Sequence, residues 1–214
     1  MKLLLTSDGL RNPTIIKAFL DLAPKPVDEL KVAFIPTAQN VKSGDKKWVF
    51  DQLTSLKDLN VKQTDIVDIS AIPKEMWLHR LQESDVIFVN GGDTLYLMDC
   101  CNKFGLTQEI PELLKDRVYV GVSAGSYIAT PDLRLCSGGD ASTKALNLTD
   151  FGLQVHLETA KYGEAKSEAA MRERTKGCPY KVYALDDQMA VKVDGDQVEL
   201  VGEGKYLTIE PSGA

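Results

Sequence analysis

The chain has 214 residues, of which 43% are hydrophobic and 26% are charged, a balance typical of a folded globular protein and not of a disordered or fibrous one. Its formal net charge is -6, and its lysines and arginines are scattered among acidic residues rather than gathered in a patch. Such a surface repels a phosphate backbone, so we expect no nucleic-acid partner.

Neither an export signal nor a membrane span is visible in the sequence. The apolar run at residues 3–5 is too short for the core of a signal peptide and reads better as a first buried strand. No run approaches the roughly 20 apolar residues that a membrane span requires. We therefore expect a cytoplasmic protein with no membrane partner.

The cysteines show neither a CxxC pair nor the spacing of a zinc site. They are Cys100, Cys101, Cys136 and Cys178. Without an export signal, reduced thiols are the simplest prediction. Because no internal repeat, low-complexity tract or linker interrupts the chain, we predict a single domain over residues 1–214.

Short apolar runs alternate with longer amphipathic stretches through the first 120 residues or so. The runs predict strands at residues 3–5, 31–35, 65–69, 85–89 and 118–120. The stretches between them predict helices at residues 13–22, 46–56, 74–81 and 94–104. This alternation indicates an α/β fold, with a mostly parallel sheet covered by helices on both faces. Ligands bind beyond the carboxyl ends of the strands in such sheets, so we expect the chemistry in those loops.

The C-terminal part of the chain has a different pattern, with short strands close together. They are predicted at residues 182–185, 190–193, 198–201 and 206–209. The turn residues Asp194-Gly195-Asp196 separate two of them. We therefore predict antiparallel strands at the edge of the sheet.

The strongest functional motif is Gly121-Val122-Ser123-Ala124-Gly125. A Gly-x-Ser-x-Gly sequence between a strand and a helix is typical of a nucleophile elbow, a sharp turn that exposes the serine hydroxyl. The first N–H groups of the following helix, beginning at Ala124, can then stabilise a developing oxyanion. The alternative is an ordinary Gly/Ser turn, and the apolar strand before the motif favours the elbow.

A second motif, Asn90-Gly91-Gly92-Asp93-Thr94, also follows a predicted strand and precedes a predicted helix. Its two glycines allow backbone N–H groups to approach a bound group closely. The sequence lacks the GxGxxG spacing of a dinucleotide site. We predict a tight turn in which Asp93 caps the helix and Gly92 supplies a second oxyanion donor.

A catalytic serine needs a base, and the chain has only two histidines, His79 and His156. His79 lies on a predicted amphipathic helix and is expected at the surface. His156 lies at the end of an apparent strand that begins near residue 151. We therefore predict that His156 is the base. In the alternative, His156 is only a half-buried residue of the strand, without a catalytic role.

Four segments, taken in order, resemble the dipeptidase E (aspartyl dipeptidase) family of serine peptidases. They are residues 34–38 (FIPTA), 91–94 (GGDT), 121–125 (GVSAG) and 145–156. Relatives usually have Gly-Gly-Asn-Thr in the second segment and Pro-His-aromatic where this chain has Val155-His156-Leu157. The resemblance implies a flavodoxin-like fold of the class I glutamine amidotransferase type, and it places His156 at the catalytic histidine of the family.

The resemblance also implies a carboxylate partner for His156. The family's acid is a Glu in the loop after a late strand, and the matching residue here is Asp187, one methylene shorter. Relatives have also been interpreted with an Asp shortly after the serine, for which Asp140 is the second candidate. The order Ser123, His156, Asp187 differs from that of α/β-hydrolases, in which the histidine comes last.

Relatives that prefer an N-terminal aspartate share a Gly-Glu-Thr-Arg segment, and the matching residues here are Gly163-Glu164-Ala165-Lys166. An Arg clamps a carboxylate with two hydrogen bonds, whereas a Lys is a point charge. The resemblance thus implies that Lys166 contacts the substrate and gives only a weak preference for Asp. Asp93 is a further substrate-binding candidate. In the alternative, Lys166 is a solvated helix residue and Arg172 or Arg174 binds the substrate.

These observations predict a serine peptidase that hydrolyses short peptides through an acyl-enzyme, without a metal or organic cofactor. Ser123 would attack the peptide carbonyl, and the N–H groups of Gly92 and Ala124 would hold the oxyanion. The alternatives are a related hydrolase acting on β-linked peptides or esters and a non-catalytic binding protein with the same fold. The sequence leaves the oligomeric state open, with a homodimer as one assembly that we consider.

Overall fold

The computed structural model describes residues 1–211, so the last three residues of the predicted single domain, 212–214, lie outside it. Within that range the strands are β1 (Lys2–Thr6), β2 (Lys31–Ile35), β3 (Gln63–Ile66), β4 (Val86–Val89), β5 (Val118–Val122), β6 (Gly152–Val155), β7 (Val182–Leu185), β8 (Met189–Asp194), β9 (Gln197–Gly202) and β10 (Tyr206–Ile209). The α-helices are α1 (Pro13–Leu22), α2 (Lys47–Asp58), α3 (Lys74–Gln82), α4 (Thr94–Phe104), α5 (Leu106–Leu113), α6 (Ala124–Tyr127) and α7 (Glu168–Thr175). The 3-10 segments are η1 (Val27–Glu29), η2 (Thr37–Gln39) and η3 (Ala160–Lys166).

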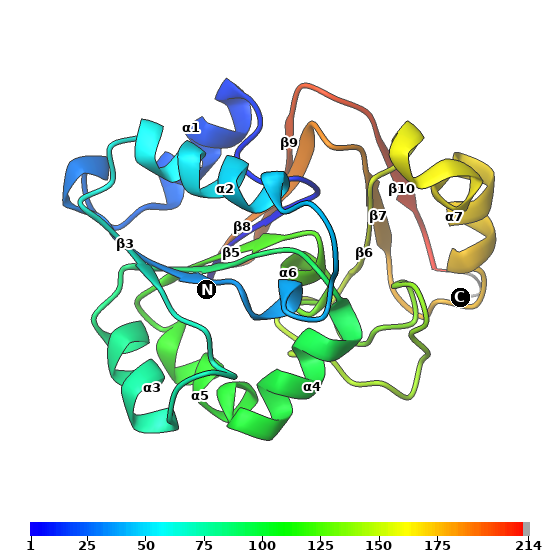
Figure 1. The fold of residues 1–214 in the computed structure, drawn as a ribbon. Helices are drawn as coiled ribbons and strands as arrows, with labels where there is room; N and C mark the ends of the chain where they lie inside the picture. The colour runs from blue at the N-terminus through cyan, green and yellow to red at the C-terminus, as the bar shows by residue number, and fades with distance from the viewer. Residues whose placement is uncertain (212–214) are drawn as a thin grey trace.

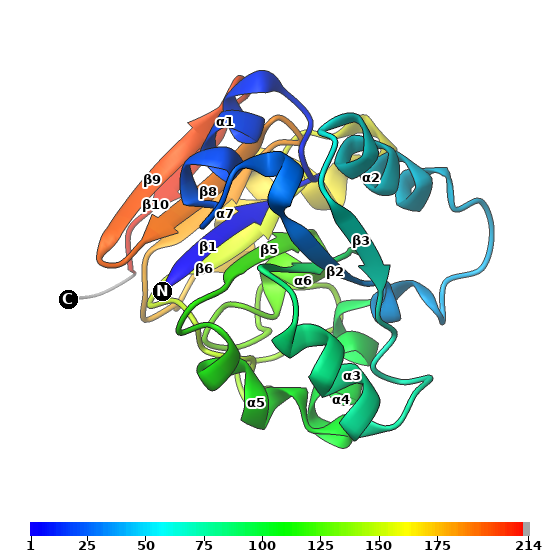
Figure 2. The ribbon, with the colours of Figure 1, turned by 90° about the vertical axis from the view of Figure 1, so that its left-hand side faces the viewer.

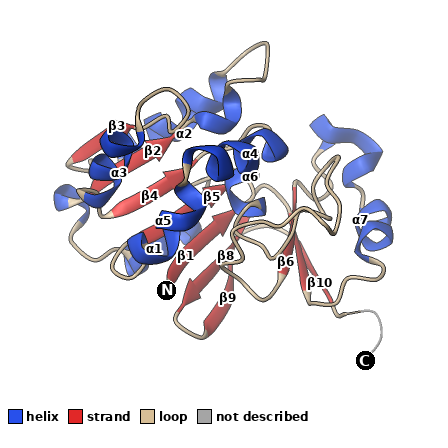
Figure 3. Ribbon diagram, turned by 90° about the horizontal axis from the view of Figure 1, so that it is seen from below, coloured by secondary structure: helices blue, strands red, loops and turns tan. Residues whose placement is uncertain are grey.

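The described strands form a larger and a smaller sheet. The larger sheet has the order β3-β2-β4-β5-β1-β8-β9. Its strands from β3 to β1 are parallel, and β8 and β9 extend it in antiparallel fashion. The smaller sheet has the order β10-β7-β6, with β6 and β7 parallel. It lies beside the larger sheet, with α7 on its outer side (Figures 1 and 3).

Helices cover both faces of the larger sheet: α1 and α2 lie on one face, and α3, α4 and α5 on the other (Figure 2). Successive side chains along β1 point to opposite faces of the sheet, so this strand contributes to the apolar layer on each face. Leu4 packs with Phe19 of α1 in one buried cluster. Leu3 and Leu5 pack with Trp77 of α3 in the other. Each face is therefore a closed apolar layer, and polar chemistry is confined to the ends of the strands.

The pairing registers bring together strand ends that are distant in sequence. In the larger sheet, Thr6 of β1 is the partner of Val122 of β5, so the chain segments that follow both strands start side by side. In the smaller sheet, Val155 of β6 is the partner of Leu185 of β7. Because parallel neighbours end at the same edge of a sheet, Ser123 and His156 each begin a loop at such an edge.

The predicted fold class is confirmed, and α1, β2, α4, β7 and β10 have the predicted bounds. The strand predicted at residues 65–69 is shifted to Gln63–Ile66. Val67 and Ile69 are apolar because they pack under α3 in the buried cluster that contains Trp77, not because they belong to the strand.

The C-terminal strands divide between the sheets, which the sequence pattern did not predict. β8 and β9 form the antiparallel edge of the larger sheet, whereas β7 and β10 belong to the smaller one. α5 and α7 were also not predicted, since α5 contains Pro111 and half of the residues of α7 are charged. None of the helices in the described residues combines the length and apolar character that a membrane crossing requires.

Candidate active site

Ser123 lies in a sharp turn between β5 and α6. Its backbone has φ 49° and ψ −102°, a sparsely populated conformation for a residue with a side chain. The flanking glycines are required by close approach: a Cβ on Gly121 would lie 2.8 Å from the Gly125 carbonyl oxygen, and one on Gly125 would lie 2.1 Å from the Val89 carbonyl oxygen. The motif therefore forms the strand–turn–helix elbow that the sequence predicts.

Ser123, His156 and Asp187 form a continuous chain of hydrogen bonds, which we call the candidate triad. The Ser123 Oγ lies 3.0 Å from His156 Nε2. The His156 Nδ1 lies 2.6 Å from Asp187 Oδ1. A carboxylate only accepts hydrogen bonds, so Nδ1 carries the proton and Nε2 is left to accept the serine proton. This is the arrangement that a serine nucleophile and its base require.

Asp187 follows β7 and is half-buried, with its two carboxylate oxygens fully engaged. Oδ1 accepts a hydrogen bond from Ser7 Oγ at 3.0 Å in addition to that from His156. Oδ2 accepts one from Thr159 Oγ1 at 3.0 Å. Burial raises the pKa of Asp187, but the hydrogen bonds from His156, Ser7 and Thr159 outweigh it and bring the pKa below its usual value. The shorter Asp side chain therefore reaches the imidazole and remains ionised.

Asp140, the second candidate for the acid, lies in a different environment. Its Oδ1 accepts hydrogen bonds from Ser142 Oγ at 2.6 Å and from the N–H groups of Ser142 and Thr143 at 2.7 and 3.1 Å. It is engaged in an exposed turn of its own, whereas Asp187 is the carboxylate in contact with His156. His79, as predicted, is on the surface, with 69% of its side chain exposed.

The two candidate oxyanion donors, the N–H groups of Gly92 and Ala124, donate none of the turn, loop or cap hydrogen bonds within residues 1–211. Gly92 has φ 145°, and a Cβ there would lie 2.2 Å from the carbonyl oxygen of Ala38, so only glycine fits. Asp93 caps α4, because its Oδ1 accepts from the Tyr96 N–H at 3.0 Å. Its Oδ2 lies 3.2 Å from Lys42 Nζ.

Lys166 ends the η3 segment and is half-buried, not the solvated helix residue of the alternative interpretation. Its Nζ donates to the Tyr127 hydroxyl at 3.2 Å, one helical turn beyond Ser123. Burial, and then the positive charge of Arg174, lower the pKa of Lys166 to about 8. Within the described residues no carboxylate lies within ion-pair distance of Lys166, so its charge is available to a ligand.

The two arginines considered as alternatives are engaged elsewhere. Arg172 pairs with Glu168 on the exposed face of α7, with Nε and Oε1 2.8 Å apart. Arg174 donates to Gln154 Oε1 at 2.8 Å and to the Ala165 carbonyl at 3.1 Å. Neither contact involves the candidate triad.

Sequence reasoning missed three residues around the candidate triad: Ser7, Thr159 and Tyr162. Ser7 and Thr159 contact Asp187, as described above. The Tyr162 ring stacks on the His156 imidazole, with centroids 4.3 Å apart and an interplanar angle of 29°. The position of Ser7 directly after the first strand was the available signal, because the loops after strands were expected to carry the chemistry.

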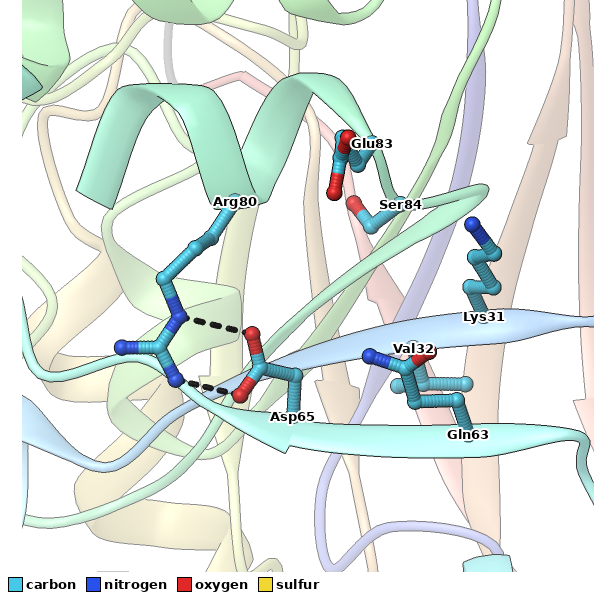
Figure 4. A pocket seen from close by; sticks show the side chains of 7 residues that line it. All are labelled: Lys31, Val32, Gln63, Asp65, Arg80, Glu83 and Ser84. Atoms are coloured by element: carbon cyan, nitrogen blue, oxygen red, sulfur yellow. Dashed lines mark hydrogen bonds and ion pairs between the residues drawn. The ribbon is translucent and has the colours of Figure 1, made fainter. Parts of the chain in front are cut away.

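A small pocket between β2, β3 and α3 is not part of this site (Figure 4). It lies near Lys31 and Ser84, at the amino ends of β2 and β4, whereas Ser123 follows the carboxyl end of β5. Its main feature is the Arg80–Asp65 ion pair, with Nε and Oδ2 2.7 Å apart, which lowers the pKa of Asp65. This pair joins α3 to an edge strand and has a structural role.

Known proteins resemble this chain over most of its length. A Shewanella oneidensis protein named Peptidase E is 28% identical over 94% of this chain and 87% of its own. A Drosophila melanogaster protein with the provisional name alpha-aspartyl dipeptidase is 30% identical over 62% of this chain and 60% of its own. A Listeria monocytogenes crystal structure, assigned to peptidase E, superposes with a TM-score of 0.79 at 23% identity and covers 95% of this chain and 98% of its own.

The family model for Peptidase family S51 matches residues 3–201. This match spans both sheets, from β1 to β9, and includes the elbow, the candidate triad and the η3 segment. The chain therefore belongs to peptidase family S51, and the protein is a peptidase.

Proposed function

We propose that this peptidase hydrolyses short peptides, dipeptides above all, through an acyl-enzyme formed on Ser123. The observation that carries the proposal is the pair of contacts between Ser123 Oγ and His156 Nε2 at 3.0 Å and between His156 Nδ1 and Asp187 Oδ1 at 2.6 Å. Nucleophile, base and orienting acid are the three roles that such a mechanism needs. No protein residue besides these has to exchange a proton with the substrate.

The proposed reaction has two stages. His156 takes the Ser123 proton as the hydroxyl attacks the peptide carbonyl, and the N–H groups of Gly92 and Ala124 stabilise the oxyanion. Asp187 holds the imidazole in the required tautomer and compensates its positive charge. His156 then gives its proton to the departing amine. In the second stage water, activated by His156, hydrolyses the ester and restores Ser123.

The proposed substrate class rests on the family and on Lys166. Relatives in this comparison carry the names Peptidase E and alpha-aspartyl dipeptidase. The half-buried Lys166 ammonium, bound to Tyr127 at 3.2 Å, supplies a single positive charge near the elbow. We propose that it contacts a carboxylate at the N-terminal side chain of the substrate and gives a modest preference for Asp. The free, buried cysteines support a reducing location such as the cytoplasm.

The proposal is tested by measuring kcat/KM for Asp-Leu, Asn-Leu, Ala-Leu and Leu-Leu with wild type and the Ser123→Ala variant. We expect wild type to hydrolyse Asp-Leu, and Ser123→Ala to lose about 10⁴-fold or more, as for other catalytic serines. Thermal unfolding of both proteins is the control for folding.

Near-native activity in Ser123→Ala would remove the serine from the mechanism. A wild-type protein that binds these dipeptides and hydrolyses none of them would favour the binding-protein alternative. Hydrolysis of β-linked peptides or esters, in place of dipeptides, would favour the related-hydrolase alternative.

A further inference from the structure

Ser7 directly follows β1, is fully buried, and lies between the candidate acid, Asp187, and the candidate base, His156. Its Oγ donates to Asp187 Oδ1 at 3.0 Å and accepts from the backbone N–H of His156 at 2.9 Å. The same oxygen lies 3.5 Å from His156 Nδ1. One hydroxyl therefore contacts the carboxylate, the backbone of the histidine and the edge of its ring.

The backbone conformation of His156 is strained and needs a hydrogen bond of this kind to hold it. Its φ is +67°, in the left-handed region that residues with a side chain rarely adopt. The direction in which the imidazole leaves the backbone depends on this conformation. The hydrogen bond from the His156 N–H to Ser7 holds the residue on one side, and that from the Leu157 N–H to the Leu185 carbonyl at 2.9 Å holds it on the other.

The carboxylate of Asp187 is fixed in the same way. Because the Asp side chain is short, the Nδ1–Oδ1 contact of 2.6 Å leaves little freedom for the carboxylate to rotate. Ser7 binds Oδ1, the oxygen that faces His156, and Thr159 binds Oδ2. Rotation of the carboxylate out of this plane would break both hydrogen bonds, so the two hydroxyls hold the plane in which one oxygen faces the imidazole.

We propose that Ser7 is a positioning residue of this peptidase, acting through Asp187 and His156. The proposal rests on the proposed function, because it assigns Ser7 to the reaction that Ser123 carries out. In this role Ser7 does not touch the substrate, and its hydroxyl holds the acid and the base in position relative to one another. The Ser7 N–H donates to the Met189 carbonyl at 3.2 Å and so fixes the loop.

The test is a double-mutant cycle with Ser7→Ala and Asp187→Ala, read out by kcat and KM on the best dipeptide and by the rate of fluorophosphonate labelling. We expect Ser7→Ala alone to lower both kcat and the labelling rate about 10- to 100-fold, the size expected for loss of a hydrogen bond to a charged group, with KM nearly unchanged. In the Asp187→Ala background, we expect the same substitution to lower the labelling rate less than about threefold, because its partner is already absent.

Two further variants keep the test decisive. Ser7→Cys keeps the shape of the side chain, with a slightly larger atom that is only a weak donor, so it should fold and lose kcat to a smaller extent than Ser7→Ala. Ser84→Ala is the matched control, since Ser84 is also buried and its hydroxyl donates to the Leu81 carbonyl at 2.8 Å, far from the candidate triad. We expect Ser84→Ala to leave kcat unchanged.

Equal losses from Ser7→Ala with and without Asp187 would show a general structural role and overturn the proposal. Wild-type kcat in Ser7→Ala or Ser7→Cys would overturn it as well, while leaving the proposed function intact if wild type still hydrolyses the peptide and labels at Ser123. A wild type that neither labels nor hydrolyses would overturn both.

Discussion

Two residues of the candidate triad, Ser123 and His156, have positive backbone φ angles of 49° and 67°. Each such conformation costs on the order of 1–3 kcal/mol in a residue with a side chain, and it persists where the surroundings determine it. The Ser123 N–H donates to the Thr6 carbonyl at 3.1 Å, and the His156 N–H donates to Ser7. The loop after β1 therefore supports both strained residues.

The choice between the two candidate acids leads to a direct prediction. Asp187→Asn should lower kcat about 10²–10⁴-fold, because an amide cannot stabilise the required tautomer and charge of His156. Asp140→Asn should leave kcat nearly unchanged, since Asp140 is bonded within its own exposed turn. Steady-state kinetics on one dipeptide measures both. An inactive Asp140→Asn beside a fully active Asp187→Asn would reverse the assignment.

The sharp turn at Ser123 could be predicted from the sequence because all of its determinants are local. Gly121 and Gly125 are one and five positions beyond the end of a recognisable strand core, and their role needs only the turn itself. The partnership of His156 with Asp187 needed the family resemblance. The position of Ser7 after the first strand was a signal for a site residue, but its partners could not be predicted, because they depend on the pairing of β1 with β5. The contact of Tyr162 with His156 could not be predicted either, because it depends on the path of η3.

Among the elements, the η3 segment determines what surrounds the imidazole of His156, the candidate base. The Glu158 N–H donates to the Lys166 carbonyl at 2.8 Å, which closes the segment into a compact loop. This loop places Tyr162 on His156 and Lys166 beside Tyr127. Its sequence has neither a helical nor a strand period, so the pattern of apolar residues gave no indication of its course.

Lys166 gives the substrate preference a predicted pH dependence. Because burial lowers its pKa to about 8, the side chain is charged below that pH and loses its charge as the pH rises through about 8. A carboxylate on the substrate is held only by the charged form. We therefore expect the ratio of kcat/KM for Asp-Leu to that for Ala-Leu to be greatest below pH 8 and to fall above it. The α-amino group is common to both substrates and cancels in the ratio.

The size of the ratio is predicted as well. One charged hydrogen bond corresponds to a preference of roughly tenfold or somewhat more. Lys166→Arg should keep the preference above pH 8, because arginine stays charged, and Lys166→Gln should abolish it at every pH. A wild-type ratio above about 10³, or one that stays constant from pH 7 to 9.5, would rule out this role for Lys166.

The helices and strands were predicted best where apolar residues follow one clear period. α4 has the predicted bounds for this reason, and β2 has them because its apolar run is continuous and ends at Pro36. β3 is a mostly exposed edge strand, and the buried residues that follow it were predicted as part of the strand in its place. α7 was missed because its apolar contacts are few, with Met171 and Thr175 as its buried residues.

At the scale of the whole molecule, the candidate triad lies where the two sheets meet. Ser123 follows β5 of the larger sheet, His156 follows β6 of the smaller sheet, and Asp187 lies in the connection from β7 to β8 that passes from one sheet to the other. The separation into two sheets was not predictable from short strands at regular spacing, since their pairing depends on contacts across the molecule. This separation nevertheless brings His156 and Asp187 to Ser123.

Activation of Ser123 by His156 can be measured by fluorophosphonate labelling followed by peptide mass mapping. We predict one adduct on Ser123 and none on Ser126, whose buried hydroxyl donates to the Thr6 carbonyl at 2.7 Å. His156→Ala should slow labelling by about 10²-fold or more, and Ser123→Ala should abolish it. Absence of the Ser123 adduct in folded wild type, or equal labelling in His156→Ala, would contradict the account.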